Sequence, residues 1–177
     1  MGEENGMVEI EKWLEIYHQA MEREFLCGFV AGKEELESWD PADRFQFFFD
    51  TVPVYGKLED LISKPSRCHA KQAALTGACN LYHGCSHNYL HTRNPDILAA
   101  LYKAARFTLR ACYFYENGSY VAKDRELLFL LSGKDREIME TAARQIERGE
   151  EELERDSRLL LEWSAGLLRR YGGGAEE

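Results

Sequence analysis

The sequence has no apolar run of the roughly 18 to 20 residues that a membrane-spanning helix requires. Its first residues, Met1-Gly2-Glu3-Glu4, are too acidic and polar for a secretory signal peptide. Its five cysteines are an odd number and fall mostly within predicted helices, which favours reduced thiols over a disulfide framework. These absences predict a cytoplasmic protein that does not act on a membrane.

The short motifs of the common enzyme classes are also missing. The sequence has no P-loop, no dinucleotide-binding glycine pattern, no G-x-S-x-G elbow, no C-x-x-C pair and no H-E-x-x-H motif. The net charge of −9 argues against DNA or another nucleic acid as the main partner, because a polyanion would meet a repulsive average field. Local motifs therefore give no support to an enzymatic function.

Length and composition predict one domain. The 177 residues are 45% hydrophobic and 12% aromatic, enough for one well-packed core and too few for two domains of ordinary size. We expect a mainly α-helical, up-and-down bundle of five or six helices with a short N-terminal extended or β element. Residues 1–62 form an N-terminal segment, residues 63–171 form the bundle packed with it, and residues 172–177 are a disordered tail.

Hydrophobic spacing predicts a series of helices. An acidic N-cap followed by a proline begins one helix at Asp40 and Pro41, and this helix should direct Phe45, Phe48 and Phe49 inward. Later helices are expected at residues 66–89, 96–117, 123–131, 134–148 and 150–171. Their predicted core positions are Ala74, Ala78, Leu81, Tyr82, Cys85, Tyr89, Ile138, Ala142, Ile146, Leu153, Leu160, Trp163 and Leu167. Gly149 is expected to cap the helix at 134–148, and Glu151/Arg155 and Glu154/Arg158 to form ion pairs.

Two segments have an extended pattern. Residues 8–11 alternate as a short strand does, but a single helix from about Met7 fits as well, with Trp13, Tyr17, Met21, Phe25 and Phe29 at helical spacing. Residues 51–56 are expected to be extended, because Pro53 is excluded from a helix interior and permits only an edge strand.

The helix at 96–117 is apolar almost all the way round. One face carries Leu98, Leu101, Ala105, Leu109 and Cys112, and Phe107, Ala111 and Phe114 lie nearly opposite, so the helix should be central. A basic stripe, defined as Lys103, Arg106 and Arg110, occupies the remaining strip. These cations require carboxylates, water or a bound anion. Two interpretations stay open: pairing with Glu137, Glu140, Glu147, Glu151 or Glu154, or phosphate binding assisted by Lys71 and Lys123.

The end of this helix carries a resemblance to a known family. The run 115–120 is an aromatic turn with Asn117 and Gly118 at its corner and Tyr120 after it, and Lys123 opens the next helix. This resembles the helical substrate-binding domain that follows the catalytic domain in many bacterial nucleotidyltransferases, a relative of HEPN bundles, over about residues 45–131. The resemblance implies a nucleotide or small anionic substrate, a homodimer, and the substrate-binding residues Lys103, Arg106, Arg110, Tyr113, Tyr120 and Lys123.

The chain departs from this family in its catalytic part. The family's Gly-Ser followed by Asp-x-Asp is absent, and only Glu9 or Glu11 would match its third metal-binding carboxylate. One carboxylate strand cannot hold Mg²⁺ against a triphosphate, so Mg²⁺ with nucleotide is expected only with a catalytic partner chain. We therefore expect a binding module or one half of a split nucleotidyltransferase. The Arg and His pair of HEPN ribonucleases is missing, which disfavours ribonuclease activity.

A row of possible metal ligands follows the helix at 66–89. Cys79, His83, His87 and His91 recur every four residues, and Cys68 and His69 lie near its start; the best set for Zn²⁺ is Cys79, His83 and His87. The row points away from the predicted apolar face. Three interpretations stay open: a wet polar face, a metal site, or a dimer interface that titrates near neutral pH. The alternative function is therefore a metal-binding or structural dimeric bundle.

Overall fold

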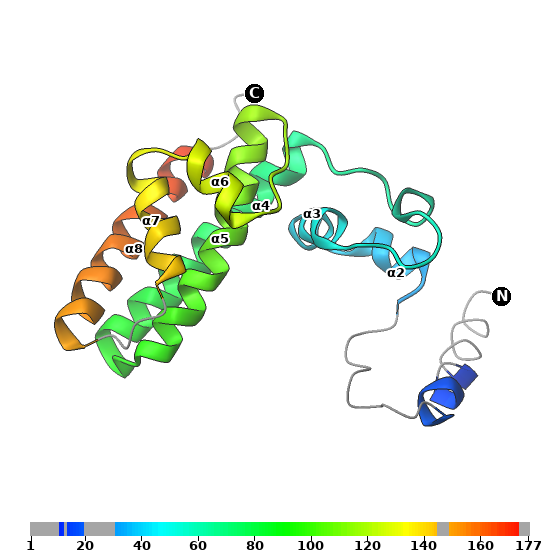
Figure 1. Ribbon diagram of the computed structural model, residues 1–177, viewed down its shortest axis with the longest axis horizontal. Helices are drawn as coiled ribbons and strands as arrows, with labels where there is room; N and C mark the ends of the chain where they lie inside the picture. The colour runs from blue at the N-terminus through cyan, green and yellow to red at the C-terminus, as the bar shows by residue number, and fades with distance from the viewer. Residues whose placement is uncertain (1–10, 13, 20–30, 145–148, 174–177) are drawn as a thin grey trace.

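The computed structural model describes residues 11–12, 14–19, 31–144 and 149–173, and this part of the chain is mainly helical, as predicted. Residues 11–12 and 14–19 are helical. The later elements, in order (Figure 1), are α2 (Lys33–Ser38), α3 (Pro41–Asp50), the 3-10 turn η2 (Leu58–Asp60), α4 (Arg67–His87), the π-helical turn η3 (Asn88–Thr92), α5 (Pro95–Asn117), α6 (Asp124–Leu130), α7 (Gly133–Ala143) and α8 (Glu150–Tyr171).

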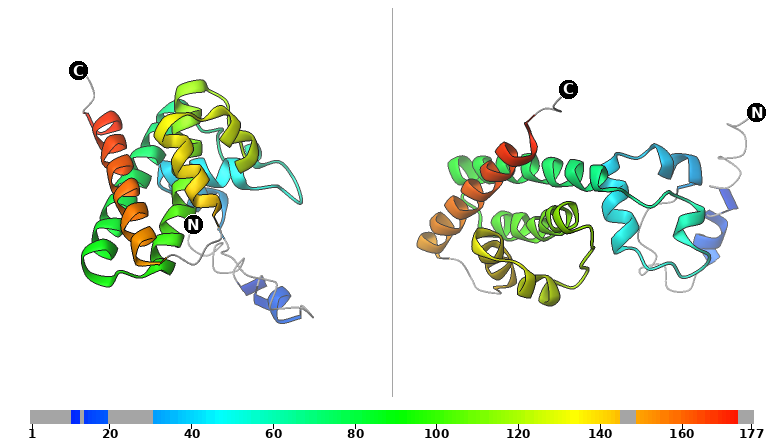
Figure 2. Two further views of the ribbon diagram at one scale, coloured as in Figure 1. Left: turned by 60° about the vertical axis from the view of Figure 1, so that its left-hand side comes forward. Right: turned by 90° about the horizontal axis from the view of Figure 1, so that it is seen from above.

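The bundle is built around α4 and α5. Helix α4 packs against α3, α5 and α8, while α7 packs against α5 and α8 (Figures 1 and 2). Helix α5 is central, as its two apolar faces predict, because both faces are buried: Leu98, Ala105 and Leu109 on one, Ala111 and Phe114 on the other. Burial of two opposite faces is what an apolar surface around most of a helix requires.

Local capping explains where the main helices begin and end. Asp40 accepts a hydrogen bond from the Ala42 backbone N–H at 2.8 Å, which confirms the predicted start of α3. Asn94 caps α5 in the same way through Asp96 N, at 2.7 Å. At the other end of α5, Gly118 has φ of 73°, a left-handed conformation that glycine adopts without steric cost.

Helix α3 connects two hydrophobic clusters. Phe45 is 2% exposed in the main core and Phe49 packs against that core, as predicted. Phe48, expected to point into the same core, packs instead against a smaller cluster formed by Leu36, Leu58 and Ile62. Helix α3 thus packs against the bundle through Phe45 and Phe49 and against the smaller cluster through Phe48.

The predicted extended segments are not strands. Residues 51–57 contain no strand, and the side chains of Val52, Val54 and Tyr55 are each at least 85% exposed. Glu11 is helical, which contradicts a strand reaching that residue. Residues 8–10 with Glu9, and also Trp13, Met21, Phe25 and Phe29, lie outside the described residues.

Several predictions at the C-terminal end need correction. Helix α7 ends at Ala143, and Gly149 is the N-cap of α8 rather than a cap of α7, with Ile146 outside the described residues. Arg155 pairs with Asp156 at 3.0 Å and not with Glu151, because the Asp156 side chain is only 4% exposed and requires a cation more strongly. The Glu154/Arg158 pair is confirmed at 2.8 Å. Of the predicted tail, Gly172 and Gly173 are described and residues 174–177 are not.

Gly77 lets α4 approach α5 closely. A Cβ atom at Gly77 would clash with Thr108 Oγ1, whereas a Cβ at Gly166 on α8 would meet nothing within 4 Å. Both glycines lie inside helices, where alanine is preferred by about 0.5 to 1 kcal/mol. We expect Gly166→Ala to raise the free energy of unfolding by that amount and Gly77→Ala to lower it by about 1 to 3 kcal/mol through overpacking. Urea denaturation of both variants tests this, and equal gains would contradict the close approach.

Candidate functional site

The basic stripe of α5 is held by carboxylates from two other elements. Arg110 Nη2 lies 2.7 Å from Asp124 Oδ1, and Arg106 Nη1 lies 2.9 Å from Asp124 Oδ2. Arg110 Nη1 also lies 3.3 Å from Asp50 Oδ1. The Arg110 side chain is 12% exposed, so this ion-pair network is partly shielded from water. It connects the end of α3 and the start of α6 to the middle of α5.

Tyr120 extends the network toward the aromatic core. Its hydroxyl donates a hydrogen bond to Asp50 Oδ1. Its ring stacks on Phe49 with centroids 4.5 Å apart and an interplanar angle of 15°. Burial, followed by the hydrogen bond to Asp50, raises the pKa of Tyr120 above its ordinary value. Tyr120 therefore stays protonated and acts as a donor that holds Asp50 in place.

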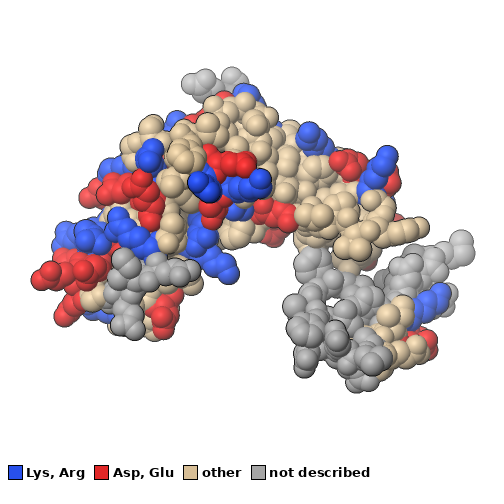
Figure 3. Space-filling model, viewed as in Figure 1, with Lys and Arg blue, Asp and Glu red and all other residues tan. Residues whose placement is uncertain are grey.

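The structure brings together only part of the predicted substrate-binding set. Arg106, Arg110 and Tyr120 meet at Asp50 and Asp124. The other three members lie elsewhere: Lys123 pairs with Glu126 at 2.9 Å, Tyr113 packs against the main core, and Lys103 is exposed with no ion pair to another described residue. Figure 3 shows basic and acidic side chains side by side over the bundle rather than in patches of one sign.

The acids that neutralise the stripe differ from those proposed from the sequence. In the described part of the chain Arg106 and Arg110 pair with Asp50 and Asp124, not with the glutamates of α7 and α8. Asp124 directly follows Lys123 at the start of α6, so it was visible as a first-turn acid. Asp50 is 60 residues from Arg110, and no local pattern links the two.

Asp124 should make stability depend on pH below about 4. Partial burial alone would raise its pKa, but hydrogen bonds from Arg110 and Arg106 outweigh burial and hold the pKa below the ordinary value of 3.8. The resulting stabilisation is complete above that ordinary value and is lost as pH falls through the lower pKa of the folded state.

We therefore expect Asp124→Asn to be less stable than the parent chain at pH 7 by about 1 kcal/mol, and this difference to shrink as the pH falls below the ordinary carboxyl pKa of 3.8. Denaturation between pH 2 and 7 measures both trends. Asp60→Asn, at an exposed carboxylate, is the control and should run parallel to the parent. A constant gap between Asp124→Asn and the parent would rule out the ion-pair origin.

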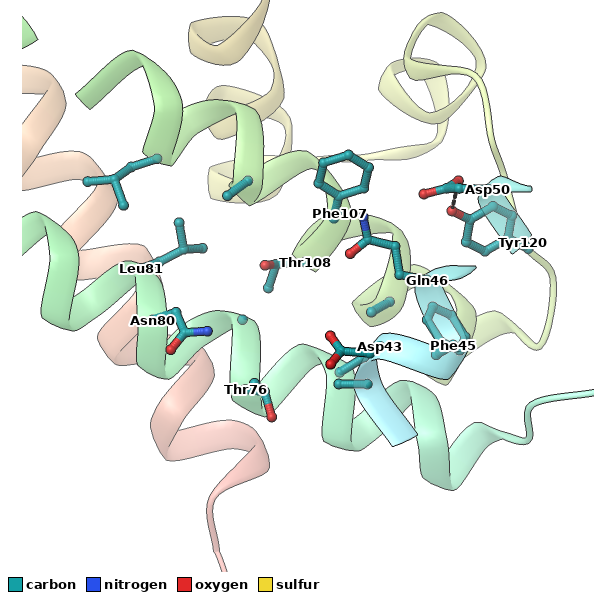
Figure 4. A pocket seen from close by; sticks show the side chains of 16 residues that line it. Asp43, Phe45, Gln46, Asp50, Thr76, Asn80, Leu81, Phe107, Thr108 and Tyr120 are labelled. Carbon is teal, nitrogen blue, oxygen red and sulfur yellow. Dashed lines mark hydrogen bonds between the residues drawn. The ribbon is translucent and has the colours of Figure 1, made fainter. Parts of the chain in front are cut away.

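A pocket opens beside this network between α3, α4 and α5 (Figure 4). Its volume is about 210 Å³. Asp43 and Gln46 extend into it from α3 toward Thr76 on α4 and Thr108 on α5. The complete lining is Ala42, Asp43, Phe45, Gln46, Asp50, Ala73, Thr76, Gly77, Asn80, Leu81, Leu101, Ala104, Phe107, Thr108, Ala111 and Tyr120. We call this the α3/α4/α5 pocket.

Most polar groups in the α3/α4/α5 pocket have no protein partner. Within the described ranges, Asp43, Gln46, Thr76, Asn80 and Thr108 make no side-chain hydrogen bond or ion pair. Thr108 is the notable member because it is only 4% exposed. A buried hydroxyl without a partner is destabilising unless water or a ligand satisfies it. The pocket therefore has the convergent free polar groups that characterise small-molecule sites.

A second, more open hollow adjoins the pocket along α3. It has a volume of about 540 Å³ and is lined by Trp39, Asp40, Asp43, Gln46, Phe47, Asp50 and Thr51. Three lining residues, Asp43, Gln46 and Asp50, belong to both spaces. These recur at i, i+3 and i+7, which places them on one face of α3.

The predicted metal ligands lie apart from this pocket. Cys79, His83, His87 and His91 are all exposed, and the rings of His87 and His91 have centroids 5.1 Å apart. Among the described residues no group of three or more His, Cys, Asp or Glu side chains could hold a metal ion. His69 caps α4, because its Nδ1 accepts a hydrogen bond from Ser66 N at 3.0 Å. The row thus lies on an exposed face of α4 and η3 without a metal-binding group among the described residues, and its use as a dimer interface stays a prediction.

The four described cysteines are free thiols. Burial raises the pKa of Cys85 to about 11 and that of Cys112 to about 12, so both stay protonated and unreactive at neutral pH. Cys68 and Cys79 are exposed, and none of the four lines the α3/α4/α5 pocket. Thiol chemistry therefore has no place in this site.

No helix in the described part of the chain is both long and apolar enough to cross a bilayer. Comparison with protein-family models, with curated proteins and with solved structures finds no match for the chain. The resemblance to nucleotidyltransferase substrate-binding domains therefore stays a prediction from sequence pattern.

Proposed function

We propose that this chain is a small-molecule-binding helical module, the substrate-binding half of a nucleotidyltransferase-like enzyme whose catalytic half is a separate chain. The α3/α4/α5 pocket is the ligand site. The observation that carries this proposal is the set of polar groups without protein partners around the pocket. Among them Thr108 is only 4% exposed as a residue, yet its hydroxyl oxygen is not fully enclosed by protein atoms and so is open to the pocket. Water in the pocket can bond to this hydroxyl, and a ligand with a hydroxyl or amide group would replace that water.

The ion-pair network defines one wall of this site. Asp50 and Tyr120 line the pocket. Arg110, which is not part of the lining, holds Asp50 in position through an ion pair. A phosphate placed on Arg106 and Arg110 would have to displace Asp50 or Asp124, because both guanidinium groups already point at these carboxylates. The stripe therefore supports the site by positioning its wall, and the ligand occupies the neighbouring pocket.

A thermal-shift panel tests this proposal. The panel contains ATP, CTP, glucose 6-phosphate, neutral sugars and small amines, each with and without Mg²⁺. A ligand present at 100 times its dissociation constant adds about 2.7 kcal/mol to the free energy of unfolding and raises the melting temperature. We expect at least one class to shift the parent chain and to lose its shift in Thr108→Val, which removes the hydroxyl and keeps the shape.

Thr92→Val is the matched control, since Thr92 is exposed and lies outside the pocket. A panel in which no class shifts the parent would overturn the proposed function. Shifts that persist in Thr108→Val and vanish in Arg106→Ala would place the ligand on the basic stripe and overturn the assignment of the pocket.

A further inference from the structure

We propose that the α3/α4/α5 pocket selects a small organic cation: a protonated amine with a neutral hydrogen-bonding group a few bonds away. This inference rests on the proposed function, because it names the chemical class of the ligand for the same site. Three observations carry it, namely the charge of the lining, the buried hydroxyl and the size of the space.

The lining is charged with one sign. Of the residues around the pocket, Asp43 and Asp50 are ionisable acids and none is Lys, Arg or His. The adjoining hollow adds Asp40 and again contains no basic residue. Asp50 is already paired with Arg110, but the Asp43 carboxylate has no partner among the described residues. A cation would therefore find a free carboxylate at Asp43 and a favourable potential on the way to it.

The part of the pocket around Thr108 favours an uncharged group of the ligand. Thr108 is 4% exposed, and Gly77 and Leu81 from α4 lie beside it in the lining. A hydroxyl or amide of the ligand would satisfy the Thr108 hydroxyl there, whereas a second charge would be desolvated without a counter-ion. The ring of Phe107 forms a further apolar wall of the pocket (Figure 4).

The space sets the size of the ligand. A volume of about 210 Å³ lies below the roughly 300 to 1,000 Å³ of pockets for drug-sized molecules. It is too small for a whole nucleotide. The geometry points to a compact amine whose ammonium group lies at Asp43 and whose other end lies at Thr108.

A series of four-carbon probes separates charge from shape. The probes are 4-amino-1-butanol, putrescine, 1,4-butanediol and 4-hydroxybutyrate, which keep one chain length and differ in end groups. We expect 4-amino-1-butanol to bind most tightly, because it offers one ammonium for Asp43 and one hydroxyl for Thr108. Putrescine should be weaker, 1,4-butanediol weaker still, and 4-hydroxybutyrate should not bind. Isothermal titration calorimetry of the full chain gives the dissociation constants.

Matched variants locate the charge. Asp43→Asn should weaken 4-amino-1-butanol by roughly threefold to fivefold, as expected for a solvent-accessible charge pair, and leave 1,4-butanediol unchanged. Asp96→Asn is the control, because Asp96 is also an exposed acid in the first turn of its helix but lies outside the pocket. Binding of the amine should also weaken when NaCl is raised, since added salt screens the Asp43 carboxylate.

The dissociation constants of the four probes, in the parent chain and in its variants, support or overturn the cation inference. Tighter binding of the amine than of the diol, lost in Asp43→Asn and kept in Asp96→Asn, supports it. Equal dissociation constants for 4-amino-1-butanol and 1,4-butanediol, or tighter binding of 4-hydroxybutyrate, would overturn the cation inference. The proposed function would still stand if Thr108→Val weakens the binding of these probes. If none of the four probes binds but another panel class shifts the melting temperature through Thr108, the cation inference alone fails.

Discussion

Replacing Phe45 by alanine should lower the free energy of unfolding by about 3 to 5 kcal/mol, the usual range for a buried phenylalanine. Phe45 is 2% exposed and its ring lies 5.0 Å from that of Phe49, 5.3 Å from Phe114 and 5.9 Å from Tyr120. The cavity would remove these contacts, which attach α3 to α5 and to the loop after it. Because Phe45 also lines the pocket, ligand binding should be lost together with stability.

Urea denaturation of Phe45→Ala beside Phe129→Ala measures this effect. Phe129 lies on α6 and is 72% exposed, so its removal should change the free energy of unfolding by less than about 0.5 kcal/mol. Similar losses in the two variants would mean that α3 does not pack on the bundle as described.

Replacing Arg110 by methionine should have the second-largest effect, a loss of about 1.5 to 3 kcal/mol, the range for hydrogen bonds to charged groups. Methionine keeps much of the apolar stem and removes the charge. Asp50, whose side chain is 23% exposed, would lose its counter-ion, and Asp124 would keep only Arg106. The penalty stays below that of a fully buried pair because both carboxylates retain some contact with water.

A double-mutant cycle with Asp124→Asn isolates the pairwise contribution. Arg169→Met on α8 is the control, since Arg169 is exposed and makes no ion pair with a described residue. We expect the combined variant Arg110→Met/Asp124→Asn to be less destabilised than the sum of the single variants. Strict additivity would show that Arg110 and Asp124 act independently.

Local sequence signals predicted the helices well because capping is decided within a few residues. Asp40 with Pro41 begins α3 as expected. Helix α5 begins at Pro95, one residue before the expected range, with Asn94 as its cap, and Gly118 ends it in the left-handed conformation. Gly149 is the exception. A glycine between two helices can cap the end of the first or the start of the second, and Gly149 caps the start of α8.

The pocket was not predictable, because it depends on which helices meet. Asp43 and Gln46 on α3, Asn80 on α4 and Thr108 on α5 come from distant parts of the chain, and none belongs to a motif. The one local clue was Gly77, a helical glycine whose missing side chain admits Thr108. The basic stripe of α5 is visible in the sequence because its like charges recur at helical spacing, whereas no local pattern links it to its partners, Asp50 and Asp124.

The central claim is that the α3/α4/α5 pocket binds a ligand, and ¹H–¹⁵N NMR titration of the parent chain with 4-amino-1-butanol tests its location most directly. We expect saturable shift changes to centre on backbone amides that line the pocket, those of Asp43, Gln46, Gly77 and Thr108. Amides along His87 and His91, which lie outside the pocket lining, should not move. Shift changes confined to those outer residues, with the pocket amides unmoved at saturation, would contradict it.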